Sequence, residues 1–205
     1  MGWEVELNAF PADCNLLAAV TRGEIDAELL TFVRTYFRMR RKLGCRVNSF
    51  AERDPECQVF VDALETIVAD HPGIDHRFCD LERRFEWLKW LLQESSHAQD
   101  ATLAATAIGG EAQVTPSARS IQGFPIRWTS PGTCELIHMW LTDLAQKDLR
   151  SHYDPDRMRN ANLYKWGPPT DTELAFEWIM DDFTSLKSFY CDVAKNSEAV
   201  LVVAD

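Results

Sequence analysis

Apolar residues at helical spacing fill most of this 205-residue chain, and this pattern constrains its fold more than any other feature. From Glu24 onward, apolar side chains share one helical face until Gly44, a residue type that commonly ends a helix. Asp54-Pro55 and Ser130-Pro131 each place a capping side chain before a first-turn proline, which indicates a helix start. The pattern predicts helices at residues 11–20, 24–43, 55–70, 78–94, 131–147, 155–160 and 170–195.

The clearest strand patterns are short and lie near the two ends of the chain. Trp3, Val5 and Leu7 alternate with polar residues, which predicts a half-buried strand. Residues 199–203 are all apolar, as is typical of a strand in the middle of a sheet. Both segments are therefore expected to belong to a sheet.

Two further short strands are expected inside the chain, at residues 103–108 and 124–129. Between them, residues 111–123 carry Pro116, Gly123 and two serines, so we expect an inserted, mobile loop there. Because helix outweighs strand and the strands do not alternate regularly with helices, the sequence predicts an α+β fold. We expect one domain over residues 1–205, with a small mixed sheet covered by several amphipathic helices.

The charge of the chain narrows the classes of partner. Its net charge is −11, whereas a phosphate-backbone interface needs clustered Lys and Arg, so no nucleic acid partner is expected. The basic run at residues 38–42 ends a predicted helix, where cations complement the helix dipole. The last predicted helix carries the acidic residues Asp171, Glu173, Glu177, Asp181 and Asp182. Such residues form a solvated helix surface or a face for a basic partner.

The sequence also lacks the signatures of a membrane segment, a cofactor loop and a cysteine metal motif. Its amino terminus has no signal-peptide pattern, and no apolar run approaches the roughly 18 residues of a membrane span. Its six cysteines include no CxxC pair, and Gly109-Gly110 lacks the spacing of a phosphate-binding loop. We therefore expect a cytoplasmic monomer or homodimer without metal or cofactor.

Three stretches of the sequence carry a family resemblance. They are residues 80–88, residues 149–158 followed by Leu163-Tyr164, and residues 183–190 followed by the apolar run at 199–203. Through these stretches the chain resembles the YfbM-like family of small bacterial proteins, which has no agreed activity. The resemblance is weakest over residues 24–75, and residues 111–123 look like an insertion. It implies a fold and a bacterial cytosolic setting, without a mechanism.

His152, Asp154 and Tyr164 form a group with the residue types of acid–base catalysis. An imidazole, a carboxylate and a phenol near a loop can exchange protons with a substrate. The alternative is structural, because Asp154 suits the cap of a helix that begins at Pro155 and Tyr164 suits packing with its hydroxyl at the rim.

An unusual aromatic patch lies on the predicted helix at residues 78–94. Seven tryptophans occur in the chain, and two of them widen the apolar face of this helix. Aromatic rings beside an arginine can form the floor of a pocket for a planar or cationic ligand. The alternative is that these rings pack in the hydrophobic core. The candidate ligand-binding residues are Arg84, Glu86, Trp87, Trp90, Tyr153 and Trp166.

Two histidine-containing groups give weaker signals. Cys134 and His138 are four residues apart, so they suit a thiolate pair or a buried thiol beside a surface histidine. His71 and His76 lie among aspartates in a loop with a Pro-Gly pair, where they suit a divalent ion or a solvated turn.

Two functional hypotheses follow from these observations. The first is a noncatalytic binding or protein-interaction domain, for example an acidic antagonist that masks a basic partner. The alternative is a small hydrolase or transferase that uses His152, Asp154 and Tyr164 on a small-molecule substrate. A carboxylate or imidazole with a strongly perturbed pKa in a cleft would favour the enzyme.

Overall fold

The computed structural model describes residues 4–13, 15–47, 55–81, 84–98, 100–120, 122–163 and 172–204. In these ranges the chain forms a five-stranded sheet with the order β2-β1-β5-β4-β3. The strands are β1 (Val5–Pro11), β2 (Phe78–Asp80), β3 (Ala112–Gln113), β4 (Arg127–Thr129) and β5 (Glu198–Ala204). The predicted α+β fold with more helix than strand is confirmed. The described strand pairs are all antiparallel, so the expectation of a mixed sheet was wrong.

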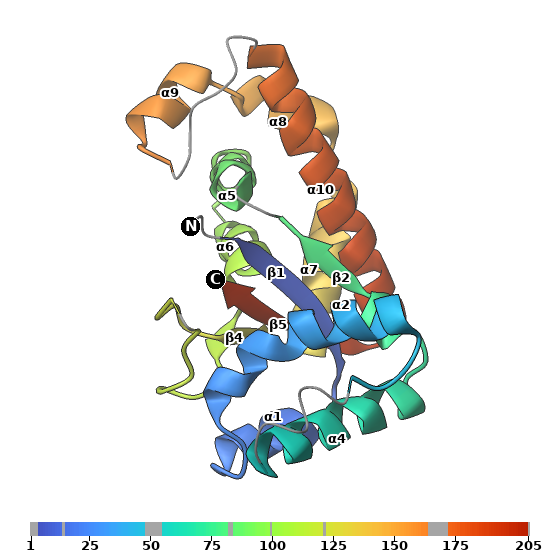
Figure 1. Cartoon of the computed structure of the whole chain (residues 1–205). Coiled ribbons are helices and arrows are strands. Elements are labelled where there is room, and N and C mark those ends of the chain that lie inside the picture. The colour runs from blue at the N-terminus through green and yellow to red at the C-terminus, as the bar shows by residue number, and fades with distance from the viewer. Residues whose placement is uncertain are drawn as a thin grey trace.

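Helices surround this sheet on both faces (Figure 1). Helix α2 crosses one face, where the Phe37 ring lies 6.2 Å from the Phe10 ring of β1, and α7 and α10 pack on the opposite face. The helices are α1 (Asn15–Thr21), η1 (Ala27–Phe32), α2 (Val33–Leu43), α4 (Pro55–Asp70), η2 (Ile74–His76), α5 (Phe85–Glu94), α6 (Ala101–Gly109), α7 (Pro131–Asp143), α8 (Gln146–His152), α9 (Pro155–Asn160) and α10 (Thr172–Lys195).

Strands β1 and β5 form the middle of the sheet. They pair along their whole length, from Val5 opposite Ala204 to Pro11 opposite Glu198. β5 also pairs with β4, so the prediction of a central strand at residues 199–203 is confirmed. One hydrophobic core cluster contains residues from Val5 in β1 to Val203 in β5.

The prediction that β1 is half-buried was wrong, because all of its residues are buried. Its expected polar face carries Glu6 and Asn8, which are only 3% and 2% exposed. Helix α2 covers that face, and Arg34 of α2 forms an ion pair with the Glu6 carboxylate. The alternation of the strand therefore reflects an internal ion pair instead of contact with water.

Two segments adopt the secondary structure opposite to the prediction. Residues 103–108 belong to helix α6, where alanine-rich sequence favours a helix and the Tyr190 hydroxyl donates to the Ala107 carbonyl at 2.9 Å. Residues 78–80 form strand β2 because Cys79 pairs with Leu7 of β1, so the helix begins only at Phe85. A short apolar run does not distinguish a strand from a buried helix.

Three predicted segments differ from the structure in part: two predicted helices are interrupted, and the predicted loop contains a short strand. The helix at 24–43 divides into η1 and α2 and ends at Gly44 with a positive φ of 67°, as predicted. The helix at 131–147 ends at Asp143 because Leu144 is extended, and α8 then begins at Gln146. In the expected insertion, β3 pairs with β4 and Ala118 is buried. The mobility of residues 111–123 stays a prediction.

Candidate functional site

The described members of the expected acid–base group make separate contacts. The Asp154 carboxylate accepts hydrogen bonds from the backbone N–H groups of Asp156 and Arg157, both at 3.0 Å, and so caps α9. The His152 ring contacts the Asp148 carbonyl through Nδ1 at 2.9 Å. Tyr164 lies outside the described residues. The described geometry therefore matches the structural alternative for Asp154 and leaves His152 at the surface.

The described residues of the aromatic patch on α5 mainly make contacts within the protein. Arg84 forms two hydrogen bonds of 2.9 Å to the buried carboxylate of Asp182 on α10, and Trp87 is 4% exposed in the core. The Trp90 ring is partly buried and lies 5.4 Å from the guanidinium of Arg157. These contacts favour core packing over an open pocket floor.

The other described ligand-binding candidates, Tyr153 and Glu86, lie in different parts of the fold, at the end of α8 and in α5. The Tyr153 hydroxyl donates to the Thr172 carbonyl at 2.8 Å, and its ring lies 5.0 Å from that of Phe176. Glu86 is partly exposed on the first turn of α5. Trp166 lies outside the described residues. The aromatic residues around Tyr153 thus join α8 to α10.

His152 instead lines a pocket with residues that the sequence did not single out. This cavity, the α6–α8 pocket, has a volume of about 330 Å³ and lies where the end of α5, the start of α6, the end of α7 and α8 meet. Its lining residues are Ser95, His97, Asp100, Trp140, Asp143, Leu144, Asp148, Ser151 and His152.

Three helix ends supply the carboxylates of the α6–α8 pocket. Asp100 precedes α6 without forming a side-chain capping bond, and Asp143 is the last residue of α7. Asp148 lies in the first turn of α8, and its Oδ2 accepts from the Ala145 N–H at 3.3 Å. No described Lys, Arg or His forms an ion pair with these three aspartates. The pocket therefore offers negative charge to a cation from outside.

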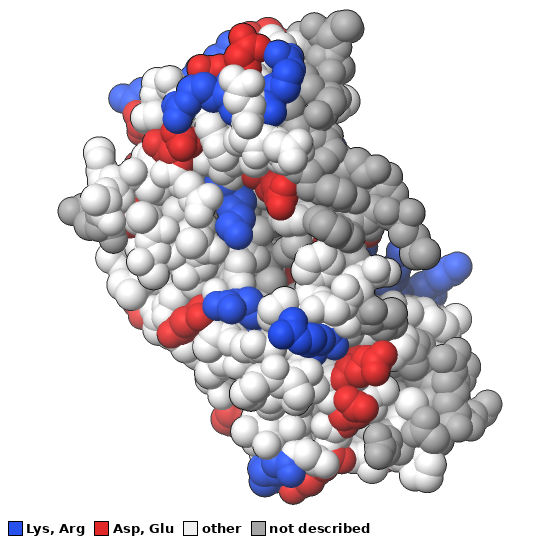
Figure 2. Space-filling view, turned by 90° about the vertical axis from the view of Figure 1, so that its left-hand side faces the viewer, with Lys and Arg blue, Asp and Glu red and all other residues white. Residues whose placement is uncertain are grey.

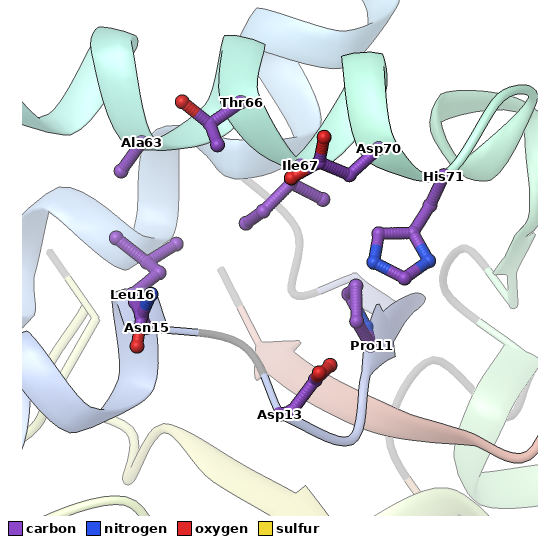
Figure 3. A pocket seen from close by; sticks show the side chains of 9 residues that line it. All are labelled: Pro11, Asp13, Asn15, Leu16, Ala63, Thr66, Ile67, Asp70 and His71. Atoms are coloured by element: carbon purple, nitrogen blue, oxygen red, sulfur yellow. The ribbon is translucent and has the colours of Figure 1, made fainter.

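A second cavity, the α1–α4 pocket, lies between the β1–α1 turn and the carboxyl-terminal half of α4 (Figure 3). Its volume is about 280 Å³. Asp13 and Asp70 approach it from opposite walls, and the His71 ring lies over Pro11 at one side. The lining residues are Pro11, Asp13, Asn15, Leu16, Ala63, Thr66, Ile67, Asp70 and His71.

The most perturbed carboxyl group described lies in neither pocket. Burial raises the pKa of Glu6 to about 7, and the Asp80 charge adds to the increase, while the Arg34 guanidinium opposes it. Arg34 also contacts Asp80 of β2 and Glu4, so a single guanidinium faces three carboxylates. This arrangement holds β1 and β2 against α2, which is a structural role.

Neither of the two weaker histidine groups gains the geometry expected for its chemical role. Cys134 is fully buried, its thiol donates to the Thr129 carbonyl, and burial raises the pKa of the thiol to about 12, which opposes a thiolate. His71 lines the α1–α4 pocket, whereas His76 lines a different cavity beside Phe78. Within the described ranges, no group of three or more His, Cys, Asp or Glu residues could hold a metal ion.

The sequence contained only part of the signal for the α6–α8 pocket. Asp148 and His152 are four residues apart on a helix, which places them on one face. Asp100 and Asp143 had no such signal, because the pocket joins helix ends that are distant in sequence and meet only after the helices pack. Trp140, which the helical spacing places on the inner face of the helix predicted at 131–147, is partly exposed at this pocket.

The helices described here include none that is long and apolar enough to cross a membrane.

Comparisons with known proteins identify a family whose function is unknown. The described fold is similar to the crystal structure of YfbM from Escherichia coli, a protein of unknown function, with a TM-score of 0.49 and 19% sequence identity. The match covers 69% of this chain and 92% of that one. No curated protein matches the chain. The family model described as a domain of unknown function, DUF1877, matches residues 45–203 and so includes most of the region where the resemblance was weakest. The chain belongs to the DUF1877 family, as its resemblance to YfbM-like proteins indicated.

Proposed function

We propose that this protein is a noncatalytic binding protein for a basic partner, and that the α6–α8 pocket receives a lysine or arginine side chain of that partner. The observation that carries the proposal is the convergence of Asp100, Asp143 and Asp148 around one cavity, where none of them forms an ion pair with a described Lys, Arg or His. Carboxylates that lack an internal partner attract a guanidinium or an ammonium group from outside.

The distribution of arginines supports this proposal. Nine described arginines form ion pairs within the chain: Arg22, Arg34, Arg40, Arg46, Arg77, Arg84, Arg150, Arg157 and Arg159. On the face drawn in Figure 2, most Lys and Arg side chains lie next to acidic ones. With a net charge of −11, the remaining acidic groups dominate the field outside the protein and steer basic partners toward it.

The walls of the pocket suit a cationic side chain. Trp140 is partly exposed there and provides an aromatic face, on which a guanidinium can stack. Ser95 also lines the pocket, and its hydroxyl has no hydrogen-bond partner among the described residues. A bound N–H donor would meet carboxylate oxygens and a hydroxyl within one cavity.

A synthetic arginine-rich peptide tests the proposal. We expect saturable binding that weakens steeply between 50 and 300 mM NaCl, because charged contacts are screened as the Debye length falls from about 14 to about 6 Å. Asp143→Asn and Asp100→Asn should each weaken binding about tenfold, which corresponds to loss of one charge-assisted hydrogen bond of about 1.4 kcal/mol. Fluorescence polarisation of a labelled peptide measures both effects.

A matched variant separates the pocket from the general charge of the protein. Glu177→Gln removes one exposed acidic charge from α10, outside the pocket, and should leave the peptide affinity within about twofold of wild type. Equal weakening in Glu177→Gln and Asp143→Asn would show a diffuse electrostatic attraction and would reject the pocket as the anchor.

A further inference from the structure

The α1–α4 pocket carries negative charge on two facing walls. Asp13 comes from the turn that follows β1, and Asp70 is the last residue of α4 (Figure 3). Both residues are exposed, and neither forms an ion pair with a described cation. By contrast, Asp62 and Glu65 of α4 pair with Arg46 and Arg40. Asp70 at the pocket is therefore an acidic residue of α4 that is available to a cation from outside the protein.

The direction of α4 adds to this negative potential. A helix carries partial negative charge at its carboxyl-terminal end, where basic side chains are usually favourable. The 16-residue helix α4 has no basic residue in its last turn and ends at Asp70, whose own charge is unfavourable there. An external ammonium group at this end would interact favourably with both the helix dipole and the carboxylate.

Apolar side chains form part of the wall of the α1–α4 pocket, beside the polar Asn15, Thr66 and His71. Leu16 and Ile67 are 1% and 7% exposed and belong to the core, and Ala63 packs against that core. Their side chains line the cavity, with Ile67 next to Asp70 and with Leu16 and Ala63 on the side away from His71 (Figure 3). A hydrocarbon stem buried on such a surface gains about 0.8 kcal/mol per methylene group.

Together these features point to one ligand class. We propose that the α1–α4 pocket binds a linear aliphatic ammonium compound, with its charged ends at Asp13 and Asp70 and its methylene chain over Leu16 and Ile67. This site is separate from the α6–α8 pocket and does not depend on the proposed partner. A free diamine and a lysine side chain share this chemistry, and the experiment distinguishes them.

Titration of the ¹⁵N-labelled protein with 1,5-diaminopentane tests the inference. We expect saturable chemical-shift changes in residues 11–16 and 63–71, with a dissociation constant that rises at least tenfold in Asp70→Asn and in Asp13→Asn. 1,5-Pentanediol, which lacks the charges, and ammonium chloride, which lacks the stem, should each bind at least tenfold more weakly. A second titration uses a lysine-containing peptide, which can change the chemical shifts of the same residues with a lower dissociation constant than the diamine. That result would assign the site to a lysine side chain of another protein, and the ammonium group would remain the ligand.

Asp181→Asn is the matched control, because it removes an exposed charge on α10 and should leave diamine binding unchanged. The inference is overturned if Asp70→Asn and Asp13→Asn bind the diamine as wild type does, if no shift saturates, or if the shifts occur only in residues 95–100 and 140–152. The last result would place the diamine in the other pocket and would support the proposed function alone. Spectra of the free variants verify that each one is folded.

Discussion

Replacing Arg34 with methionine is expected to lower the free energy of unfolding by about 3–5 kcal/mol at pH 8 and by much less at pH 5. Arg34 of α2 faces Glu4, Glu6 and Asp80, and the Glu6 side chain is almost completely buried. At pH 8 the substitution leaves a buried negative charge without its cation. At pH 5 the Glu6 carboxyl of the folded protein carries a proton, because burial raises its pKa to about 7. Urea unfolding at the two pH values measures the difference.

Glu6→Gln isolates the pH-dependent part of this effect. The folded pKa of Glu6 lies above its ordinary value of 4.5, so the folded state retains a proton that the unfolded state loses as pH rises toward 7. The contribution of Glu6 to stability is therefore greatest below about pH 4.5 and falls as pH rises through this window. The side chain of Glu6→Gln cannot ionise. As pH rises from 4.5 to 8, the free energy of unfolding of this variant should therefore increase relative to that of the wild type by on the order of 3 kcal/mol.

An exposed carboxylate provides the comparison for this pH series. Glu177→Gln on α10 should change stability by less than about 0.5 kcal/mol at each pH. If Arg34→Met cost the same at pH 5 and pH 8, Glu6 would be ionised throughout that range and the Arg34 ion pairs would outweigh the effect of its burial.

The sequence predicted the elements whose signals are local. Ser130 accepts a hydrogen bond from the Thr133 N–H at the start of α7, and Gly44 ends α2 with a positive φ. The apolar run at 199–203 lies between two strands, where both faces are covered. Each of these features depends on residues close in the chain or on a continuous apolar run, so the sequence pattern was sufficient.

Predictions failed where a distant segment decided the outcome. Cys79 is in a strand because Leu7 lies opposite it, and Glu6 is buried because α2 supplies Arg34. The α6–α8 pocket shows the same limit, since His152 gains Asp100 and Asp143 as neighbours only when separate helices pack. Pairing across such distances leaves no regular spacing in the sequence.

Gly110→Ala is expected to destabilise the protein by about 2–6 kcal/mol, because this glycine combines a backbone conformation that is nearly restricted to glycine with a close approach to the sheet. Its φ of 74° and ψ of 156° lie in a region that is essentially restricted to glycine and costs an L-residue about 1–3 kcal/mol. A Cβ atom there would also lie 2.8 Å from Cβ of Arg127 and 3.2 Å from Cγ2 of Val202. These neighbours pair across β4 and β5, so moving them would disturb the ladder at about 1–3 kcal/mol more.

Gly23→Ala provides the matched test of this argument. Gly23 has a φ of 73°, but a Cβ atom there would meet nothing within 4 Å. Gly23→Ala should therefore cost only backbone strain, about 1–2 kcal/mol, and the excess in Gly110→Ala measures the close packing of the α6 end on the sheet together with the more restricted backbone of Gly110. Equal losses in the two variants, compared by chemical unfolding, would mean that β4 and β5 yield easily to an added methyl group. The sheet next to Gly110 would then be looser than the pairing of Arg127 with Val202 indicates.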